Sequence, residues 1–294
     1  MKALHSWSRA FAALVIGVIG VLASVVSSAS LGRQDTVFRA RTETVRIDVL
    51  VTERGVTVKG LAADDFEVLD NGIPQRVELI THEPLPLGLV LALDASESVE
   101  GNRLASLVAA SNALLDALEP NDSVTLLTFN HALALRTNQS RDPRDARAAL
   151  AAMQGEGMTA LRDAAYAGLL LGENAPGRGI VVVFSDGFDT SSWLSRDQVL
   201  SSARLADVLV YAVTLDVRQP EFLRELATAT GGTVFQADSE ANLKTVFLQV
   251  LEDFRNRYLI GYQPTRVAPR GWHTLQVRVK GRGFNVKARP GYMR

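Results

Sequence analysis

The stretch LVLALDASESVEGNRL, residues 89–104, decides the fold of this chain of 294 residues. Five consecutive apolar residues end at Asp94, and a helix-like pattern begins after Ser96 and Ser98. A short run that is apolar throughout predicts a strand buried on both faces, as in a parallel sheet covered by helices. The polar residues that follow require an explanation, because a helix cap uses only one of them.

The sequence after this strand alternates short apolar runs with amphipathic segments. Such alternation predicts an α/β fold, namely a doubly wound, mostly parallel sheet flanked by helices. The expected strands are 88–93, 123–129, 132–136, 179–185, 208–214 and 233–235, and the expected helices lie near 102–118, 142–153, 160–172, 195–205, 219–229 and 239–256.

Two flanking segments show a different, period-two pattern. The first contains alternating apolar and polar positions and the dipeptide Asn71-Gly72, which is typical of a tight turn between two strands. A linker with two prolines follows it. We therefore expect an N-terminal β segment at 36–83, the α/β domain at 87–254 and a C-terminal β segment at 258–294.

The composition is that of an ordinary globular protein, with 47% apolar and 21% charged residues and a formal net charge of −1. This balance gives no global field that would recruit nucleic acid. Cysteine is absent, which excludes disulfides, thiolate metal sites and cysteine catalysis. From Arg255 to Arg294 there are ten basic and no acidic residues. These residues form either the solvated faces of strands or a surface for an anionic partner.

The first 30 residues have the pattern of a targeting segment. Basic residues precede an uncharged apolar run from Ala10 to Val26, and small residues follow up to Ser30. This is the pattern of a secretory signal peptide, while the length of the run also allows a retained membrane anchor. Both alternatives predict that the rest of the chain is exported, as a periplasmic or extracellular protein or one anchored to the membrane and facing outward.

Three loops place polar side chains next to expected strands or helices. The first contains Asp94, Ser96 and Ser98, the second places Thr159 after two glycines, and the third contains Asp186 in SDG. Each has an ordinary alternative: a helix N-cap for the hydroxyl residues and a strand-terminating turn for the aspartate. Loops at the carboxyl ends of parallel strands meet at one edge of a sheet, so we expect the five side chains to converge.

The five residues offer only oxygen atoms as ligands. Mg²⁺ takes about six oxygens at ~2.0–2.1 Å and usually keeps water. Five side chains leave at least one position for water or for an outside ligand such as a carboxylate. We therefore predict a divalent-cation site, with Mg²⁺ as the first choice and Mn²⁺ or Ca²⁺ as alternatives. The absence of His and Cys among the five disfavours zinc.

The D-x-S-x-S motif in DASES, the threonine of GMTAL and the aspartate of SDG resemble the metal-ion-dependent adhesion site of von Willebrand factor A (vWA) domains. The resemblance covers the whole α/β segment, and all five site positions are present. It implies that Ser96, Ser98 and Thr159 coordinate the cation directly. It also implies that Asp94 and Asp186 act mainly through bound water.

The flanks are similar to those of a bacterial family of exported vWA-related proteins. GLAADDFEVLDNG precedes the domain, and YLIGYQP and VKARPGY follow it. This resemblance implies that the segments 36–83 and 258–294 pack together as a small β-sandwich-like module, with the vWA domain inserted between them.

The predicted function is a non-enzymatic binding or adhesion module of the bacterial envelope, which captures an Asp or Glu carboxylate of a protein partner through the cation. A Mg-dependent hydrolase is the first alternative, although Ser96 stands where a second aspartate would serve as the acid–base group. The sequence also contains neither a phosphate-binding Gly-rich loop followed by Lys nor a nucleophile elbow. An envelope scaffold with a non-essential metal site is the second alternative. No nucleic-acid partner and no catalytic residue are predicted, and membrane contact is expected only through an uncleaved N-terminal segment.

Residues near the predicted site have ordinary interpretations as well. Phe188 and Trp193 are expected in the core by default, with an exposed apolar rim as the alternative. Asp189 and Asn130 are expected to be turn residues. Asp163 either supports the metal site or interacts with the dipole of its helix.

Overall fold

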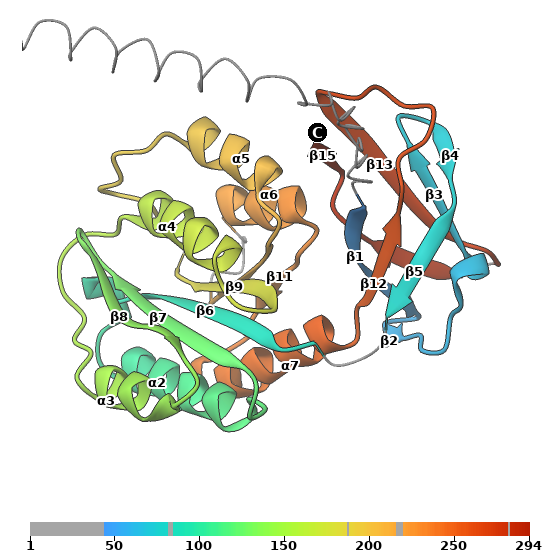
Figure 1. Cartoon of the computed structure of the whole chain (residues 1–294). Helices are drawn as coiled ribbons and strands as arrows, with labels where there is room; N and C mark the ends of the chain where they lie inside the picture. The colour runs from blue at the N-terminus through green and yellow to red at the C-terminus, as the bar shows by residue number, and fades with distance from the viewer. Residues whose placement is uncertain (1–43, 82–84, 187, 216–219, 282) are drawn as a thin grey trace, which may run out of the picture. The chain divides into compact units, whose positions relative to one another are not determined.

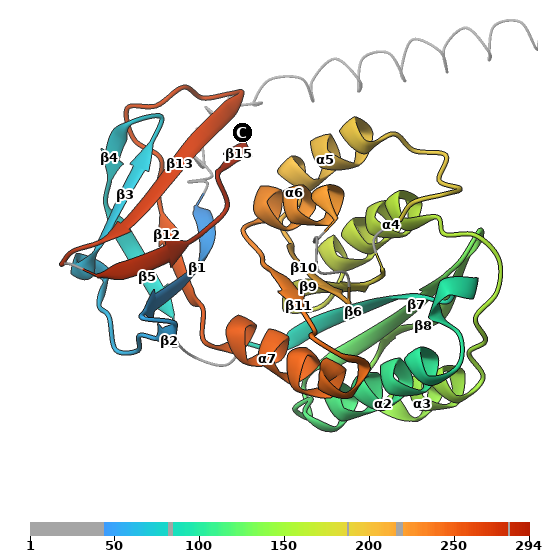
Figure 2. The same ribbon diagram turned by 180° about the vertical axis from the view of Figure 1, so that it is seen from behind.

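The computed structural model describes residues 44–81, 85–186, 188–215, 220–281 and 283–294 (Figures 1 and 2). The chain separates into two units, Met1–Thr42 and Glu43–Arg294, and all of the described residues belong to the second. The predicted targeting segment at 1–30 lies outside the described residues. In the part of the chain that is described, no helix is both long and apolar enough to cross a membrane.

The larger part of this unit is built on a sheet with the strand order β11-β10-β9-β6-β7-β8. Its neighbouring strands run parallel until β8, which pairs with β7 in the antiparallel direction. The central strand β6 is buried along its whole length. The strands are β6 Leu87–Asp94, β7 Ser123–Phe129, β8 Leu133–Ser140, β9 Arg178–Phe184, β10 Leu209–Thr214 and β11 Val234–Gln236.

Helices cover both faces of this sheet (Figure 1). Leu89 and Leu91 of β6 join a core with α2, α3 and α7 on one face, whereas Val90 and Ala92 join a core with α4, α5 and α6 on the other. One apolar run thus supplies two cores, because successive side chains of a strand point to opposite faces. The helices are α2 Asn102–Asp116, α3 Pro143–Ala151, α4 Leu161–Glu173, α5 Arg196–Leu205, α6 Glu221–Thr230 and α7 Leu243–Arg255, and the 3₁₀ turns are η1 Ala63–Asp65, η2 Glu97–Val99 and η3 Glu240–Asn242.

Strands from before and after this α/β part form a smaller β module. One of its sheets has the order β14-β1-β12-β5, with β2 paired to β1, and the other has the order β15-β13-β3-β4. Ile47, Val68 and Ile260 belong to a core that both sheets share. The strands are β1 Val45–Glu53, β2 Val56–Thr57, β3 Phe66–Asp70, β4 Ile73–Gln75, β5 Val77–Thr81, β12 Tyr258–Tyr262, β13 Trp272–Val279, β14 Phe284–Lys287 and β15 Gly291–Met293.

Two tight turns of this module depend on positive backbone φ angles. Asn71 and Gly72 have φ values of 49° and 79° between the antiparallel strands β3 and β4. Arg54 and Gly55 have φ values of 51° and 81° between β1 and β2. Positive φ at both central residues is typical of a two-residue hairpin turn. The hairpin predicted at Asn71-Gly72 is confirmed.

A buried carboxylate lies at the centre of the β module. Asp70 Oδ2 accepts hydrogen bonds from the hydroxyls of Tyr262 and Tyr292, each at 2.8 Å, and Oδ1 lies 2.7 Å from Nδ1 of His273. Burial raises the pKa of both phenols, that of Tyr292 to about 12. Both hydroxyls therefore stay protonated at neutral pH and donate to Asp70, which ties β3 to β12, β13 and β15.

Two arginines connect the α/β part to the β module and its connecting chain. Arg178 at the start of β9 forms an ion pair with Asp48 of β1, and its guanidinium carbon lies 4.4 Å from the centre of the Phe254 ring. Arg257, which follows α7, is buried and pairs with Asp253 at 3.1 Å. Removal of one partner from a buried pair leaves an uncompensated charge and is costly, so these contacts fix the end of α7.

This architecture is the fold class predicted from the sequence, including the flanking β module. Two elements differ from their predicted bounds by four residues at one end, and the others by two or fewer. The helix expected at 239–256 begins as the 3₁₀ turn η3, which has no side-chain cap, and becomes α-helical only at Leu243. The strand expected at 132–136 extends to Ser140, because its pairing with β7 continues past two register irregularities.

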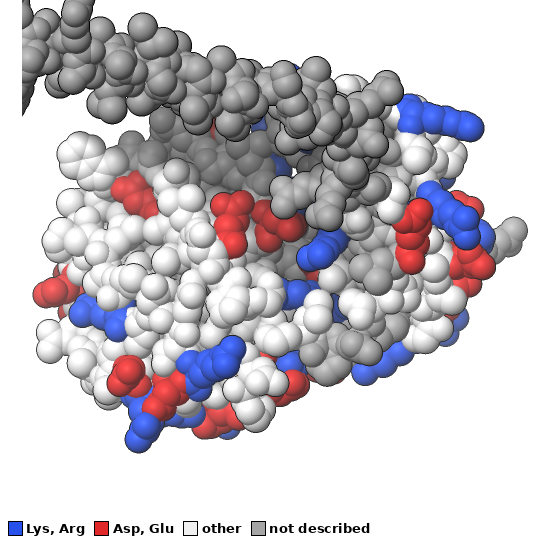
Figure 3. All heavy atoms as spheres, in the orientation of Figure 1, with Lys and Arg blue, Asp and Glu red and all other residues white. Residues whose placement is uncertain are grey.

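On the face shown in Figure 3, acidic and basic side chains are interspersed.

Candidate metal-binding site

The expected site lies at the carboxyl edge of the sheet, where the strand order reverses. The chain leaves β6 for β7 on one side and later returns to β9 on the other side of β6. The loops after β6 and β9 therefore border the crevice in which open α/β sheets bind ligands. Asp94 is the last residue of β6, and Asp186 comes two residues after the end of β9.

Asp94 is fully buried and is held by two hydrogen bonds. Its Oδ1 accepts from the backbone N–H of Ser96 at 2.9 Å, and its Oδ2 accepts from the hydroxyl of Ser185 at 2.7 Å. Burial raises the pKa of Asp94, hydrogen bonding to Ser185 and Ser96 opposes this shift, and the charge of Asp186 adds to the rise. A cation at this place would stabilise the charged form of Asp94.

The hydroxyls of Ser96 and Ser98 form a hydrogen bond, with their oxygens 3.0 Å apart. Neither serine caps a helix through its side chain. The turn η2 begins after Ser96 without a side-chain hydrogen bond, and α2 begins after Gly101, whose φ is 64°. Ser96 therefore stands at the N-cap position of η2, but without the side-chain hydrogen bond that a cap supplies. Adjacent ligands of an octahedral Mg²⁺ lie about 3 Å apart, since each is ~2.0–2.1 Å from the ion, so the spacing of the two hydroxyls fits a shared cation.

The loop that contains Thr159 is joined to the first loop by backbone hydrogen bonds. The N–H of Glu156 donates to the carbonyl of Ala95 at 2.9 Å, and the N–H of Glu97 donates to the carbonyl of Gly157 at 3.1 Å. The two loops, which lie about 60 residues apart in the sequence, thus form one surface.

Glycine allows this close approach. A Cβ atom at Gly155 would lie 3.0 Å from the carbonyl oxygen of Ser96, and Gly157 has a φ of 72°, which glycine adopts without steric cost. Thr159 is buried, and the N-cap position of α4 belongs to Ala160 instead. The N-cap interpretation of Thr159 is therefore wrong.

The third loop is joined to the second at Thr159 itself. The N–H of Thr159 donates to Oγ1 of Thr190 at 2.9 Å. The carbonyl of Thr159 accepts from the N–H groups of Thr190 and Ser191 at 2.9 and 3.1 Å. All three predicted loops are thus held together by hydrogen bonds.

Asp186 is incompletely satisfied. Its Oδ1 is buried and has no hydrogen-bond partner among the described residues. Its Oδ2 lies 3.9 Å from Nη1 of Arg103, in the first turn of α2. A buried acceptor without a donor costs about 1–3 kcal/mol, and more when it is charged. A cation, or water bound to a cation, would remove this cost.

The donor set fits a hard divalent cation. It consists of two carboxylates and three hydroxyls, which are the oxygen ligands that Mg²⁺ accepts. Within the described ranges, no group of three or more His, Cys, Asp or Glu side chains is placed to hold a metal ion.

Two carboxylates attach the third loop to α4. Asp189 pairs with the guanidinium of Arg162 at 3.0 Å and accepts its backbone N–H at 2.9 Å. Burial alone would raise the pKa of Asp189, but hydrogen bonds from Arg162 and Ser192 outweigh it and hold the pKa below its usual value. Asp163 accepts the backbone N–H of Trp193 at 2.9 Å. Both acids therefore position the loop, and Asp189 does more than close a turn.

Three large apolar side chains of the second and third loops are exposed at the surface. Met158, next to Thr159, is 57% exposed, Phe188 is 62% exposed and Trp193 is 94% exposed. The default expectation of core packing is wrong for Phe188 and Trp193, because both side chains are exposed. Their role as a rim around the cation stays a prediction. The backbone N–H of Trp193 donates a hydrogen bond to Asp163, so the loop that carries Trp193 is held in place.

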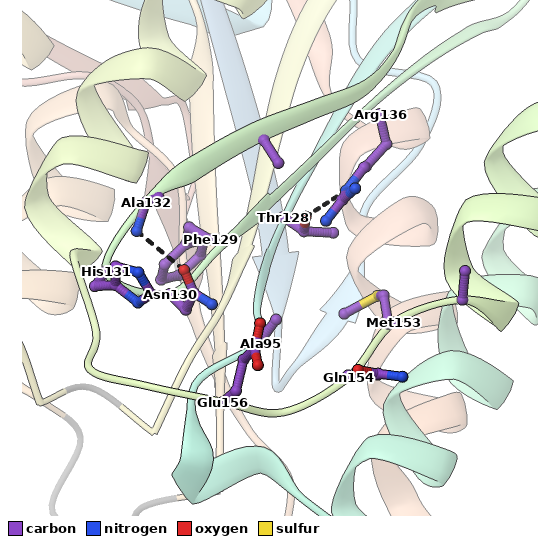
Figure 4. Close-up of a pocket in the computed structure, with 12 residues that line it drawn as sticks. Ala95, Thr128, Phe129, Asn130, His131, Ala132, Arg136, Met153, Gln154 and Glu156 are labelled. Atoms are coloured by element: carbon purple, nitrogen blue, oxygen red, sulfur yellow. Dashed lines mark hydrogen bonds between the residues drawn. The ribbon is translucent and has the colours of Figure 1, made fainter.

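A hollow of about 300 Å³ adjoins the first two loops (Figure 4). Ala95 and the β7–β8 hairpin contribute to its lining. Asn130 Oδ1 accepts the N–H of Ala132 at 3.0 Å, which confirms Asn130 as a turn residue, and Arg136 Nε donates to Thr128 Oγ1 at 2.9 Å. None of the five predicted ligands lines this hollow, so it is a neighbouring surface and not the predicted cation position.

Three residues that support the site were not identified from the sequence. Ser185 holds Asp94, Thr190 holds Thr159, and Arg103 lies against Asp186. Arg103 had a recognisable signal, because the helix dipole disfavours a cation in a first turn. The other two lie in the same loop as Asp186 and had no distinguishing pattern.

Comparisons with known proteins agree with this architecture. The family model described as von Willebrand factor type A domain matches residues 89–249. A UPF0353 protein of Mycolicibacterium vanbaalenii is 27% identical over 221 residues, which cover 63% of this chain and 64% of that protein. An uncharacterized protein of Synechocystis sp. is 32% identical over 97 residues, which cover 32% of this chain and 22% of that protein. The chain thus spans less than two thirds of the length of these curated relatives.

A solved structure with a similar fold is proximal thread matrix protein 1 from the mussel byssus. Its metal-ion-dependent adhesion site (MIDAS) motif is occupied by zinc. It aligns with a TM-score of 0.52 and 14% sequence identity, and covers 64% of this chain and 50% of that chain. At this identity the likeness concerns the fold alone.

Proposed function

The chain belongs to the von Willebrand factor type A domain family, and from this premise we propose that it is an exported, non-enzymatic binding module whose divalent cation captures a carboxylate of a protein partner. The observation that carries the proposal is the joining of three loops at the switch point of the sheet. They bring Asp94, Ser96, Ser98, Thr159 and Asp186 to one edge, and Asp186 keeps a buried oxygen without a partner among the described residues.

In this proposal Ser96, Ser98 and Thr159 hold the cation through their hydroxyls, and Asp94 and Asp186 hold water molecules bound to it. The cation supplies Lewis acidity toward a carboxylate. The mussel protein carries zinc at its MIDAS motif, but a donor set of oxygens alone favours Mg²⁺, with Mn²⁺ or Ca²⁺ next. The five side chains leave a coordination position for the partner.

The surroundings of the site support a protein partner. Met158, Phe188 and Trp193 are large apolar side chains exposed on the two loops that also carry Thr159 and Asp186. Aromatic side chains in such positions are enriched among the residues that dominate binding energy. Hydrogen bonds already hold these loops in place, so the loops lose little conformational entropy when a partner binds.

The surroundings give less support to hydrolysis. A general acid–base group must reach the reacting atoms and exchange a proton with them. Both oxygens of Asp94 accept hydrogen bonds from Ser96 and Ser185, and the carboxylate is fully buried. We therefore assign Asp94 a structural and electrostatic role toward the cation.

Titration calorimetry with Mg²⁺ and Mn²⁺ tests the proposal. The wild type is expected to bind one dication, and D94N, T159V and D186N are expected to lose at least tenfold in affinity, which corresponds to about 1.4 kcal/mol. The matched control is D197N, which removes an exposed carboxylate in the first turn of α5. Equal affinity in D186N and the wild type contradicts the site, as does the absence of dication binding in the wild type.

The proposed capture of a partner's carboxylate needs a second measurement. A pull-down from envelope extract is performed with wild-type protein in Mg²⁺, wild-type protein in EDTA, and D186N in Mg²⁺. A partner captured only under the first condition, whose binding is lost when its acidic residues are changed to amides, supports the proposal. Equal capture in EDTA supports the scaffold alternative.

A further inference from the structure

Arg103 places a positive charge against the predicted cation site. Its Nη1 donates to the backbone carbonyl of Ser98 at 2.7 Å and lies 3.9 Å from Oδ2 of Asp186. Its Nε lies 3.7 Å from Oε1 of Glu240, which precedes α7. Within the described part of the chain, Arg103 is the one basic side chain at ion-pair distance from Asp186.

The position of Arg103 has no advantage for its own helix. It lies in the first turn of α2, where the helix dipole disfavours a cation. The side chain is only 33% exposed, so its charge is partly desolvated and weakly screened. The hydrogen bond to Ser98 holds the guanidinium beside a loop that contributes two of the predicted cation ligands.

The formal charges around the site define what this arginine does. Two ionised carboxylates, Asp94 and Asp186, equal the charge of one dication, so the loaded site is neutral without Arg103. Arg103 adds one positive charge beside the loaded site, and the carboxylate of Glu240, 3.7 Å from its Nε, offsets part of this charge. The same charge repels a dication that binds alone, because like charges a few ångströms apart interact unfavourably even in a high effective dielectric.

We infer that Arg103 sets the charge balance of this site: it weakens binding of the dication alone and strengthens binding of a carboxylate to the loaded site. This inference rests on the proposed function and identifies a specificity-determining residue for it. Glu240 moderates the effect, since its carboxylate shares the guanidinium with Asp186. Linkage requires that a carboxylate which favours the loaded site also tightens retention of the cation.

Substitution of Arg103 separates the two effects. In calorimetric titrations, R103Q is expected to bind Mg²⁺ and Mn²⁺ about tenfold more tightly than the wild type, while R103K stays within about twofold because it keeps the charge. The second readout is the water-proton relaxation caused by bound Mn²⁺ while acetate, the carboxylate probe, is titrated. R103Q is expected to need several-fold more acetate than the wild type to displace bound water.

The matched control is R144Q, which removes a surface arginine paired with Asp142 at the start of α3. It changes the net charge equally and is expected to leave both readouts unchanged. Unchanged or weaker dication binding in R103Q overturns the inference, and so does equal acetate dependence. No dication binding by the wild type overturns the proposed function itself, so the two failures are distinguishable.

A variant of the neighbouring acid tests the same idea if R103Q does not fold. E240Q removes the carboxylate that shares the guanidinium, so the uncompensated charge of Arg103 and the loss of the negative charge of Glu240 act in the same direction. E240Q is expected to bind Mn²⁺ several-fold more weakly than the wild type. Equal or tighter binding in E240Q contradicts the role of Arg103.

Discussion

Asp94 and Ser185 are 91 residues apart in the chain, and their side chains form a hydrogen bond of 2.7 Å between the ends of β6 and β9. The bond crosses the point where the strand order reverses. It fixes one carboxylate oxygen of Asp94, while the N–H of Ser96 fixes the other. The orientation of the predicted metal-binding loop thus depends on a contact between two adjacent strands.

Loss of this hydrogen bond should destabilise the metal-free protein. We expect S185A to lower the free energy of unfolding by about 1–3 kcal/mol in EDTA, because a buried carboxylate oxygen loses its donor. Urea denaturation measures the change. The matched control is S111A, since the Ser111 hydroxyl is buried without a hydrogen-bond partner in the described structure. Equal stabilities of S185A and S111A would show that the bond contributes nothing.

The clamp between Asp189 and Arg162 should make loop stability depend on pH. The pKa of Asp189 is lowered in the folded protein, so its stabilising contribution is present above its unfolded pKa of about 3.9 and is lost as pH falls through the lower folded pKa. We expect D189N to be less stable than the wild type by about 2 kcal/mol at neutral pH, with the difference shrinking in acid. Urea titrations at several pH values test this, and a difference that grows in acid would contradict the assigned sign.

Removal of the exposed tryptophan should leave the fold intact. W193A is expected to change the free energy of unfolding by no more than about 0.5 kcal/mol, as for ordinary surface substitutions, because the side chain is 94% exposed. A buried aromatic such as Phe184 would cost about 3–5 kcal/mol when changed to alanine, and F184A is the contrasting variant. A loss above about 2 kcal/mol in W193A would show that Trp193 packs in the core.

The buried carboxylate of the β module should be sensitive to each of its donors. We expect Y292F to lower the free energy of unfolding by about 1.5–3 kcal/mol, because the carboxylate of Asp70 loses the hydrogen bond that the Tyr292 hydroxyl donates to it. The control is Y166F, which changes a partly buried tyrosine on α4 that packs beside the second core of the α/β sheet. Thermal and urea unfolding measure both. Equal stability of Y292F and Y166F would contradict the role of Tyr292 as a donor to Asp70.

Most of the fold could be predicted from the sequence, because apolar runs and turn residues are local features of the chain. The apolar run ending at Asp94 and the run at 179–185 predicted strands buried on both faces, and their alternate residues do supply two cores. Asn71-Gly72 predicted a hairpin because few residue pairs adopt two successive positive φ angles. Helix starts were less accurate, since η3 replaces the first turn expected for the last helix.

The sequence predicted which residues belong to the candidate site, but not their burial or their hydrogen-bond and ion-pair partners. The sequence by itself determined which side chains follow the strands at the switch point, because strand ends and loop spacings are properties of the local pattern. Only the tertiary structure decided that Asp94 is buried against Ser185, that Arg103 reaches Asp186 and that Trp193 stays in solvent. These facts depend on contacts between segments tens of residues apart, and hydrophobic periodicity carries no information about which distant side chains meet.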